Sequence, residues 1–185
     1  MLFQRENPQG IDFAIHDLQR ELFIELIKNF DWRDYDSYDR AYKNSRGSDV
    51  IPEVYIGKGE YKEVLYNDKK AITSFFLVDD KRTYDYEKFL FTQNVSIIFQ
   101  SNLSKLFPLV KHQPDEEMID EIRRAIKKRY WENRLTEVIT GVDKVYESLK
   151  LSYSKKDFAD MYNYGIARFN FQMIYSNTEK IIFIK

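Results

Sequence analysis

The sequence predicts an α+β fold in which two or three amphipathic helices flank a single, mainly antiparallel sheet. Two stretches far apart in the chain, residues 93–100 and 168–175, alternate apolar with polar side chains, which is typical of half-buried strands. Neither strand can hide its apolar face alone, so the simplest solution is one sheet that contains both and is covered by the helices. The apolar positions are Val95, Ile97, Phe99, Phe169, Phe171, Met173 and Tyr175.

Apolar residues that recur every three or four positions predict the helices. The first stripe spans residues 11–26, which corresponds to a helix of about five turns. A second helix is expected to open after Pro114, where the acidic residues 115–117 suit the positive end of the helix dipole. A third amphipathic segment covers residues 138–149, with Gly141 weakening its middle. The stripe of the first helix consists of Ile11, Ile15, Leu18, Leu22 and Leu26, and that of the third segment of Val138, Val142, Val145 and Leu149.

Between residues 30 and 50 the apolar pattern gives way to alternating acidic and aromatic residues. A segment of this kind predicts a long loop, with a short strand at residues 40–43 as the alternative. Its rings either fold back onto the body or form a protein–protein contact, because Trp and Tyr are enriched at binding hot spots. The candidate contact residues are Trp32, Tyr35, Tyr38 and Tyr42.

Shorter patterns predict the remaining strands. Residues 51–56 suggest a strand, which the Gly-Lys-Gly turn at 57–59 would return into a partner strand at 61–66. Residues 71–78 form an apolar run suited to a central strand, and the polar residues 81–87 predict a connection.

Length and composition predict one soluble domain. A chain of 185 residues with 43% hydrophobic residues can bury a core as a single unit. Its formal net charge of -1 provides no global electrostatic case for binding nucleic acid or an anionic membrane. Zero cysteines exclude disulfides, thiolate catalysis and sulfur-ligated metals. The N-terminus lacks the apolar core of a signal peptide, and no apolar run approaches the roughly 20 residues that span a bilayer.

The chain is expected to divide into three parts. Residues 1–10 form an N-terminal arm, residues 11–176 the single α+β domain, and residues 177–185 a C-terminal arm or edge strand. The C-terminal segment is either the last strand of the chain's own sheet or an arm that adds a strand to a neighbour's sheet. Its candidate contact residues are Ile181, Ile182, Phe183 and Ile184.

No catalytic, cofactor-binding or metal-ligating site is predicted. The sharpest enzymatic alternative is the acid-x-lysine pattern of Glu60 and Lys62, with Asp49 or Glu53 as an upstream acid. One class of nucleases uses such a set to bind magnesium and direct a water molecule. Three-residue patterns of this type arise often by chance, however, in a chain that is 32% charged.

The order of elements resembles that of the tail-terminator or neck-ring proteins of tailed bacteriophages, including those of crAss-like phages. The similarity covers most of residues 11–176, from the leading amphipathic helix to the closing alternating strand. It rests on the local patterns Arg40-Ala41-Tyr42-Lys43-Asn44, Ile51-Pro52-Glu53-Val54-Tyr55, Ser74-Phe75-Phe76, residues 95–103 and Asp115-Glu116-Glu117.

This resemblance implies a non-enzymatic virion protein without a cofactor, assembled in the cytoplasm of the bacterial host. Its copies would form a ring of six or twelve subunits in the neck or tail, in contact with portal or adaptor proteins and tail proteins. DNA would pass through the ring without being recognised. A compact chain of this size has a radius of gyration of about 16 Å, so only several copies can surround a duplex. The alternatives are the metal-dependent nuclease described above and a small bacterial binding module.

Overall fold

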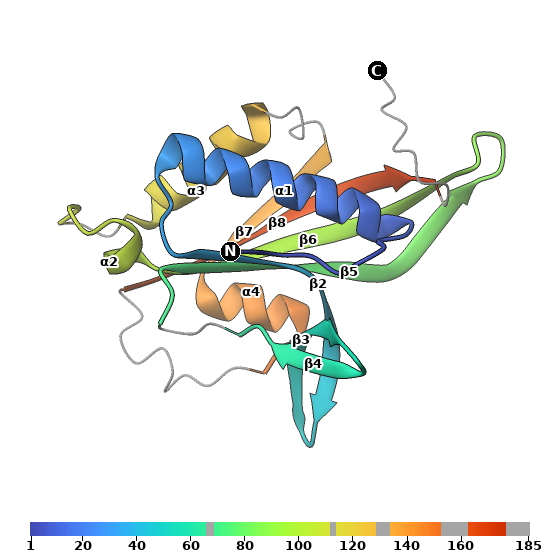
Figure 1. Ribbon diagram of the computed structural model, residues 1–185, viewed down its shortest axis with the longest axis horizontal. Helices are drawn as coiled ribbons and strands as arrows, with labels where there is room; N and C mark the ends of the chain where they lie inside the picture. The colour runs from blue at the N-terminus through green and yellow to red at the C-terminus, as the bar shows by residue number, and fades with distance from the viewer. Residues whose placement is uncertain (66–68, 112–113, 129–133, 153–162, 177–185) are drawn as a thin grey trace.

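A computed structural model describes the chain from residue 1 to residue 176 apart from residues 66–68, 112–113, 129–133 and 153–162. The fold is α+β, with one mainly antiparallel sheet, as the sequence predicts (Figure 1). Four helices lie in the described part of the chain: α1 (Ile11–Phe30), α2 (Leu103–Leu106), α3 (Asp115–Lys128) and α4 (Val142–Leu149). None of the helices in these ranges combines the length and apolar character that crossing a membrane demands.

The sheet follows the order β4-β3-β2-β5-β6-β8-β7, and β1 lies beside β2. All neighbours pair antiparallel except β1 with β2 and β2 with β5, which are parallel. The strands are β1 (Leu2–Phe3), β2 (Tyr35–Arg46), β3 (Asp49–Gly57), β4 (Glu60–Glu63), β5 (Ile72–Asp85), β6 (Leu90–Asn102), β7 (Leu135–Thr140) and β8 (Tyr164–Tyr175).

The two alternating stretches pair with each other, which confirms the prediction that one sheet contains both. In the antiparallel β6–β8 ladder, Val95 lies opposite Phe171 and Ile97 opposite Phe169. All four side chains are fully buried. Because cross-strand neighbours share a face, these pairs form the floor of the main core.

Helices cover both faces of the sheet. On one face α1 and α3 pack over β6 and β8, and on the other α4 forms a second core (Figure 1). The predicted stripe of α1 is buried along its whole length. On the α4 side, Ile98 and Gln100 of β6 are also fully buried, so this central strand is covered on both faces over part of its length.

The predicted loop at residues 30–50 is wrong, since β2 occupies most of this segment. The alternative of a strand at residues 40–43 was correct but too short. Acidic residues made the segment look solvated, yet Asp36 and Asp39 are buried. Each finds a cation far away in the sequence: Asp36 lies 3.5 Å from Lys70, and Asp39 lies 2.9 Å from Arg5.

Two other boundaries also differ from the prediction. The expected amphipathic helix at residues 138–149 is divided by Gly141, whose φ of 93° suits glycine, so β7 ends before it and α4 begins after it. The expected connection at residues 81–87 is mostly strand, because β5 continues to Asp85.

Strands β5 and β6 extend past the body as a hairpin (Figure 1, right). The β2–β5 pairing ends at Phe76, whereas β8 pairs with β6 as far as Phe91, one residue from the start of β6 at Leu90. The four turn residues 86–89 lie beyond both neighbouring strands. We call residues 86–89 the hairpin tip.

Candidate functional site

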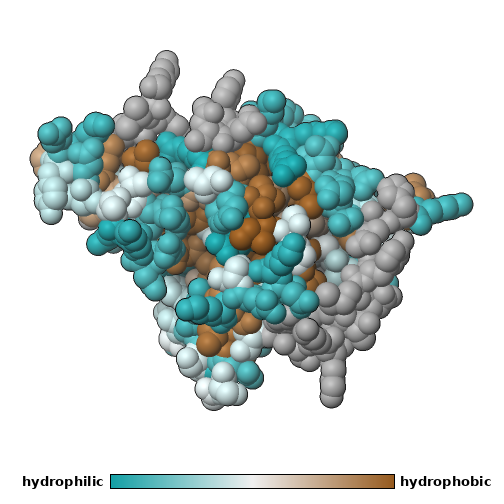
Figure 2. Space-filling view, turned by 180° about the vertical axis from the view of Figure 1, so that it is seen from behind, coloured by the Kyte–Doolittle hydropathy of each residue, from teal (hydrophilic) through white to brown (hydrophobic). Residues whose placement is uncertain are grey.

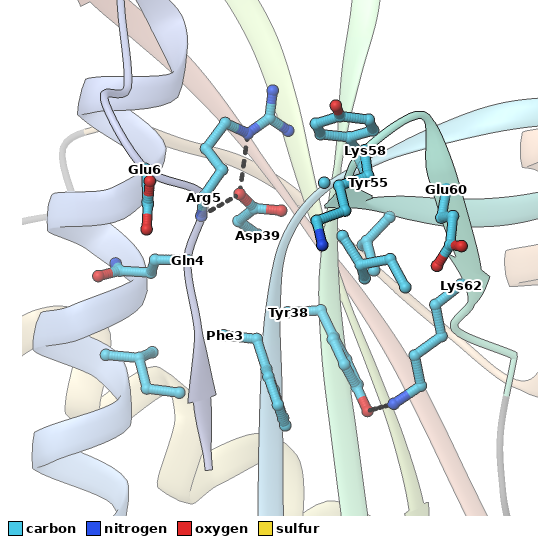
Figure 3. A pocket seen from close by; sticks show the side chains of 14 residues that line it. Phe3, Gln4, Arg5, Glu6, Tyr38, Asp39, Tyr55, Lys58, Glu60 and Lys62 are labelled. Atoms are coloured by element: carbon cyan, nitrogen blue, oxygen red, sulfur yellow. Dashed lines mark hydrogen bonds and ion pairs between the residues drawn. The ribbon is translucent and has the colours of Figure 1, made fainter.

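A large hollow lies between the N-terminal arm and the β3–β4 hairpin (Figure 3). Its volume is about 1130 Å³, which is within the size range of ligand sites or slightly above it. We call this hollow the arm groove. Its walls come from residues 2–6, from Tyr38 and Asp39 of β2, and from residues 54–58, 60 and 62.

One wall of the groove is the N-terminal arm, which is fastened to β2 by main-chain pairing and by one ion pair. Leu2 and Phe3 pair with Ser37 and Tyr38 as a parallel strand. Beyond this strand, the backbone N–H and the Nε of Arg5 both donate to Oδ2 of Asp39, at 3.0 and 2.9 Å (Figure 3). The arm is therefore an integral part of the fold.

A polar network surrounds this ion pair. Nη1 of Arg5 lies 3.2 Å from a carboxylate oxygen of Asp12 and 2.9 Å from the hydroxyl of Tyr42, and Nε2 of His16 lies 3.3 Å from Asp39. Burial acts to raise the pKa of Asp39, but hydrogen bonds from His16 and Arg5, with the charge of Arg5, hold it below its ordinary value. Burial likewise acts to lower the pKa of Arg5, and its partners Asp39 and Tyr42 raise it overall. Both groups therefore stay ionised in the fold.

Aromatic rings and a lysine form the floor of the groove. The rings of Phe3 and Tyr38 stack with centroids 4.7 Å apart. The Nζ of Lys62 lies 5.0 Å from the centre of the Tyr38 ring and donates to its hydroxyl at 3.0 Å (Figure 3). A cation held against aromatic faces is stabilised by the ring quadrupole. The groove is thus preformed, with an apolar floor and a positive charge beside it.

Three of the four predicted contact rings belong to the core of this chain. Trp32, Tyr35 and Tyr38 are 1%, 2% and 7% exposed. The hydroxyl of Tyr35 is hydrogen-bonded to Ser74 at 2.7 Å, and burial raises its pKa to about 12. Their burial favours the alternative in which these rings fold back onto the body over the one in which they form a protein–protein contact. Only Tyr42 remains half-buried, and Ile181, Ile182, Phe183 and Ile184 lie outside the described residues.

The residues of the nuclease alternative do not converge. Lys62 pairs across the hairpin with Val54, so these two side chains share one face of the strands. Glu60 lies two positions before Lys62 on that face, whereas Glu53, next to Val54, points to the other face. One metal ion cannot contact Glu53 and Glu60 together in this arrangement.

The carboxylate of Glu53 is already engaged on its own face. It accepts hydrogen bonds from Asn44 and Arg46, both at 2.6 Å, and these bonds lower its pKa. The other candidate acid, Asp49, is exposed at the start of β3, whereas Glu60 pairs with Gly57 at the end of that strand. Over the described ranges, no cluster of three or more His, Cys, Asp or Glu residues is arranged to hold a metal ion.

The hairpin tip is a second candidate site, and the sequence reasoning missed it. Tyr86 is 80% exposed and Phe89 is 71% exposed. The turn itself is fixed, because a carboxylate oxygen of Asp85 accepts the backbone N–H groups of Glu87 and Lys88 at 3.0 and 3.1 Å. Seen from behind, the hairpin end of the molecule shows apolar surface among hydrophilic residues (Figure 2, left).

The backbone of the tip is strained at Phe89. Its φ of 56° lies in the left-handed region, which costs a residue with a Cβ roughly 1–2 kcal/mol. Glycine or asparagine usually occupies such positions, and a bulky residue there is an outlier. Strain of this kind concentrates at functional sites. The aromatic residues within the polar stretch 81–89 are a signal for this site that the sequence does show. The φ angle of Phe89 cannot be read from a sequence.

The arm groove and the hairpin tip both present aromatic side chains at the described surface. Comparison with known proteins adds no relative: no protein-family model matches the chain, and no curated protein matches it. The geometry of the arm groove and of the hairpin tip therefore supplies the structural basis for a functional conclusion.

Proposed function

We propose that the chain is a structural subunit that works by associating with further copies of itself, and that it makes and breaks no covalent bond. The observation that carries this proposal is the hairpin tip, where two aromatic rings project beyond the body and one of them sits on a strained backbone. Exposed aromatic residues on a preformed turn are suited to serve as the anchors of an interface.

The tail-terminator-like order of elements supplies the biological setting of the proposal. We infer that the assembly is a ring of six or twelve copies in the neck or tail of a tailed phage, since closed cyclic symmetry is the common outcome of self-association. Portal or adaptor proteins and tail proteins are the expected neighbours in the virion. DNA passes through the ring, and assembly takes place in the host cytoplasm.

Replacing Phe89 with glycine should separate association from stability. Glycine relieves the left-handed strain but loses backbone entropy worth about 0.5–1 kcal/mol, so the free energy of unfolding should change by less than about 1 kcal/mol. Loss of an aromatic hot-spot residue costs an interface at least about 2 kcal/mol, which weakens association roughly 30-fold. Sedimentation velocity over a concentration series measures the association, and urea unfolding measures the stability.

The matched control is Leu109→Gly. Leu109 is 92% exposed and lies far from the hairpin in sequence, so its removal takes away apolar surface without changing the tip. Association of the Leu109 variant should equal that of the wild type. A wild-type protein that stays monomeric at several hundred micromolar, and also fails to join portal and tail proteins encoded beside it, would contradict the proposal.

A further inference from the structure

We propose that the hairpin tip of one copy docks into the arm groove of the next copy. This inference rests on the self-association proposed above and names the two surfaces that meet. The tip lies at one end of the long axis of the molecule, well away from the N-terminal arm and β3–β4 (Figure 1). The tip therefore cannot reach the groove of its own chain, and the contact has to join two copies.

The two surfaces match in chemistry. The groove has an aromatic floor, and two apolar side chains at its rim remain partly open: Tyr55 is 38% exposed and Ile56 is 57% exposed. The tip supplies Tyr86 and Phe89, and aromatic pairs contribute about 0.5–1.5 kcal/mol each beyond the area that they bury. A hollow of about 1130 Å³ has room for both rings and for the turn that carries them.

Charges at the two surfaces are also complementary. Among the described residues, Lys58 and Lys62 at the groove form no ion pair with an acid, and the carboxylate of Glu87 at the tip has no cationic partner. Glu60 also lines the groove and offers a second acid to Lys88 of the tip, whose Nζ lies 3.8 Å from Asp85 of its own chain. Each surface thus presents an acid beside a lysine, and such a pattern fixes the orientation of docking more than it adds affinity.

Contact area indicates how such a docking would behave. Two aromatic rings bury about 300–500 Å², whereas a stable interface needs about 800 Å² from each partner. A single docking event is therefore weak. In a closed ring every copy uses both its tip and its groove, so closure adds one contact without adding a subunit. Because tip and groove are different surfaces, the contact is head-to-tail, which generates a ring where the rotation between neighbouring copies closes and an open filament where it does not.

The absence of cysteine from the chain allows a direct test by disulfide cross-linking. One batch carries Glu87→Cys and a second carries Lys58→Cys, and the two are mixed under mild oxidation. A disulfide forms readily only where the Cα atoms approach within about 7 Å. We expect the mixed pair to form dimers at least tenfold faster than Glu87→Cys mixed with Leu109→Cys, on a non-reducing gel.

A second pair guards against a badly placed cysteine. Lys88→Cys mixed with Glu60→Cys samples the same contact from the other side of the turn. A single chain that carries both Glu87→Cys and Lys58→Cys should give a ladder of cross-linked species that ends at the copy number of the ring.

The possible failures are distinguishable. If mass photometry shows oligomers of the wild type while both cysteine pairs cross-link no faster than the Leu109 control, the tip-to-groove contact is wrong and self-association stands. If no oligomers form, with or without portal and tail proteins, both the self-association and the docking are wrong.

Discussion

Replacing Trp32 with alanine is expected to lower the free energy of unfolding by about 3–5 kcal/mol, the range for truncating a buried Trp. The side chain is 1% exposed and makes edge contacts with Tyr35 and Phe99, with ring centroids 5.7 and 6.0 Å apart. Its Nε1 also donates to a carboxylate oxygen of Glu121 at 2.5 Å. The alanine variant therefore loses a core ring and leaves a partly buried carboxylate without its donor.

The conservative variant Trp32→Phe separates these two losses. It keeps most of the ring but removes the donor to Glu121, so we expect a smaller loss of about 1–3 kcal/mol. Urea unfolding at one fixed protein concentration measures both variants. If the ring were instead an anchor for a partner, Trp32→Ala would unfold like the wild type and only its association would suffer. That result would refute the assignment of Trp32 to the core.

Replacing Asp39 with alanine is expected to cost about 1.5–3 kcal/mol, the range for hydrogen bonds to a charged group, because it removes the closer of the two carboxylates that hold the partly buried Arg5 and leaves only Asp12. The same change removes the acceptor of the Arg5 backbone N–H, so the N-terminal arm should come away from β2. We expect faster hydrogen exchange and faster proteolytic cleavage at residues 2–6. Arg20→Ala is the matched control, because its pair with Asp17 lies on the surface of α1 and contributes at most about 1 kcal/mol. Wild-type stability and an equally protected arm in Asp39→Ala would contradict this account.

The same carboxylate predicts how stability depends on pH. The pKa of Asp39 is lower in the folded protein than in the unfolded chain. In an unfolded chain the pKa of an Asp is about 3.9. The stabilisation that it provides is therefore fully present above the unfolded pKa and is lost as the pH falls through the lower, folded pKa. Asp39→Asn should flatten this part of the acid-unfolding curve. A variant curve with the full wild-type slope below about pH 4 would show that another group is responsible.

Local sequence patterns predicted the helices and strands that pack through apolar contacts alone. The alternation of β6 and β8 and the stripe of α1 record which side chains face the core, and burial of that side follows from the hydrophobic effect alone. The pairing of Val95 with Phe171 then follows, because the apolar faces of β6 and β8 are both buried under the same helices. These elements could be predicted without any knowledge of distant contacts.

Strand β2 could not be predicted in the same way, because its composition is explained only by residues far away in the chain. Asp36 and Asp39 read as solvent-exposed until Lys70 and Arg5 are placed beside them. The rings of Trp32 and Tyr35 likewise read as surface residues until α1 and β6 close over them. A buried charge is tolerable only with a partner, and the sequence does not show where that partner comes from.

The candidate site was missed for a related reason. The arm groove exists because β1 and β3 both lie along β2, which is a matter of topology. The sequence predicts an N-terminal arm, but the arm's position over Tyr38 depends on the polar network around Arg5. At the hairpin tip, the decisive feature is the φ of Phe89, which no composition or periodicity reveals.

Beyond Phe76 no strand of the described ranges pairs with the outer edge of β5. Such an edge exposes amide and carbonyl groups that invite indiscriminate strand addition and aggregation. Here the stretch from residue 79 to residue 85 carries five ionised side chains: Asp79, Asp80, Lys81, Arg82 and Asp85. Charged residues of this kind oppose strand addition along the outer edge of β5, and the exposed rings of Tyr86 and Phe89 lie beyond them. Indiscriminate strand addition along this edge is therefore disfavoured, whereas the rings of the hairpin tip stay open to the contact proposed above.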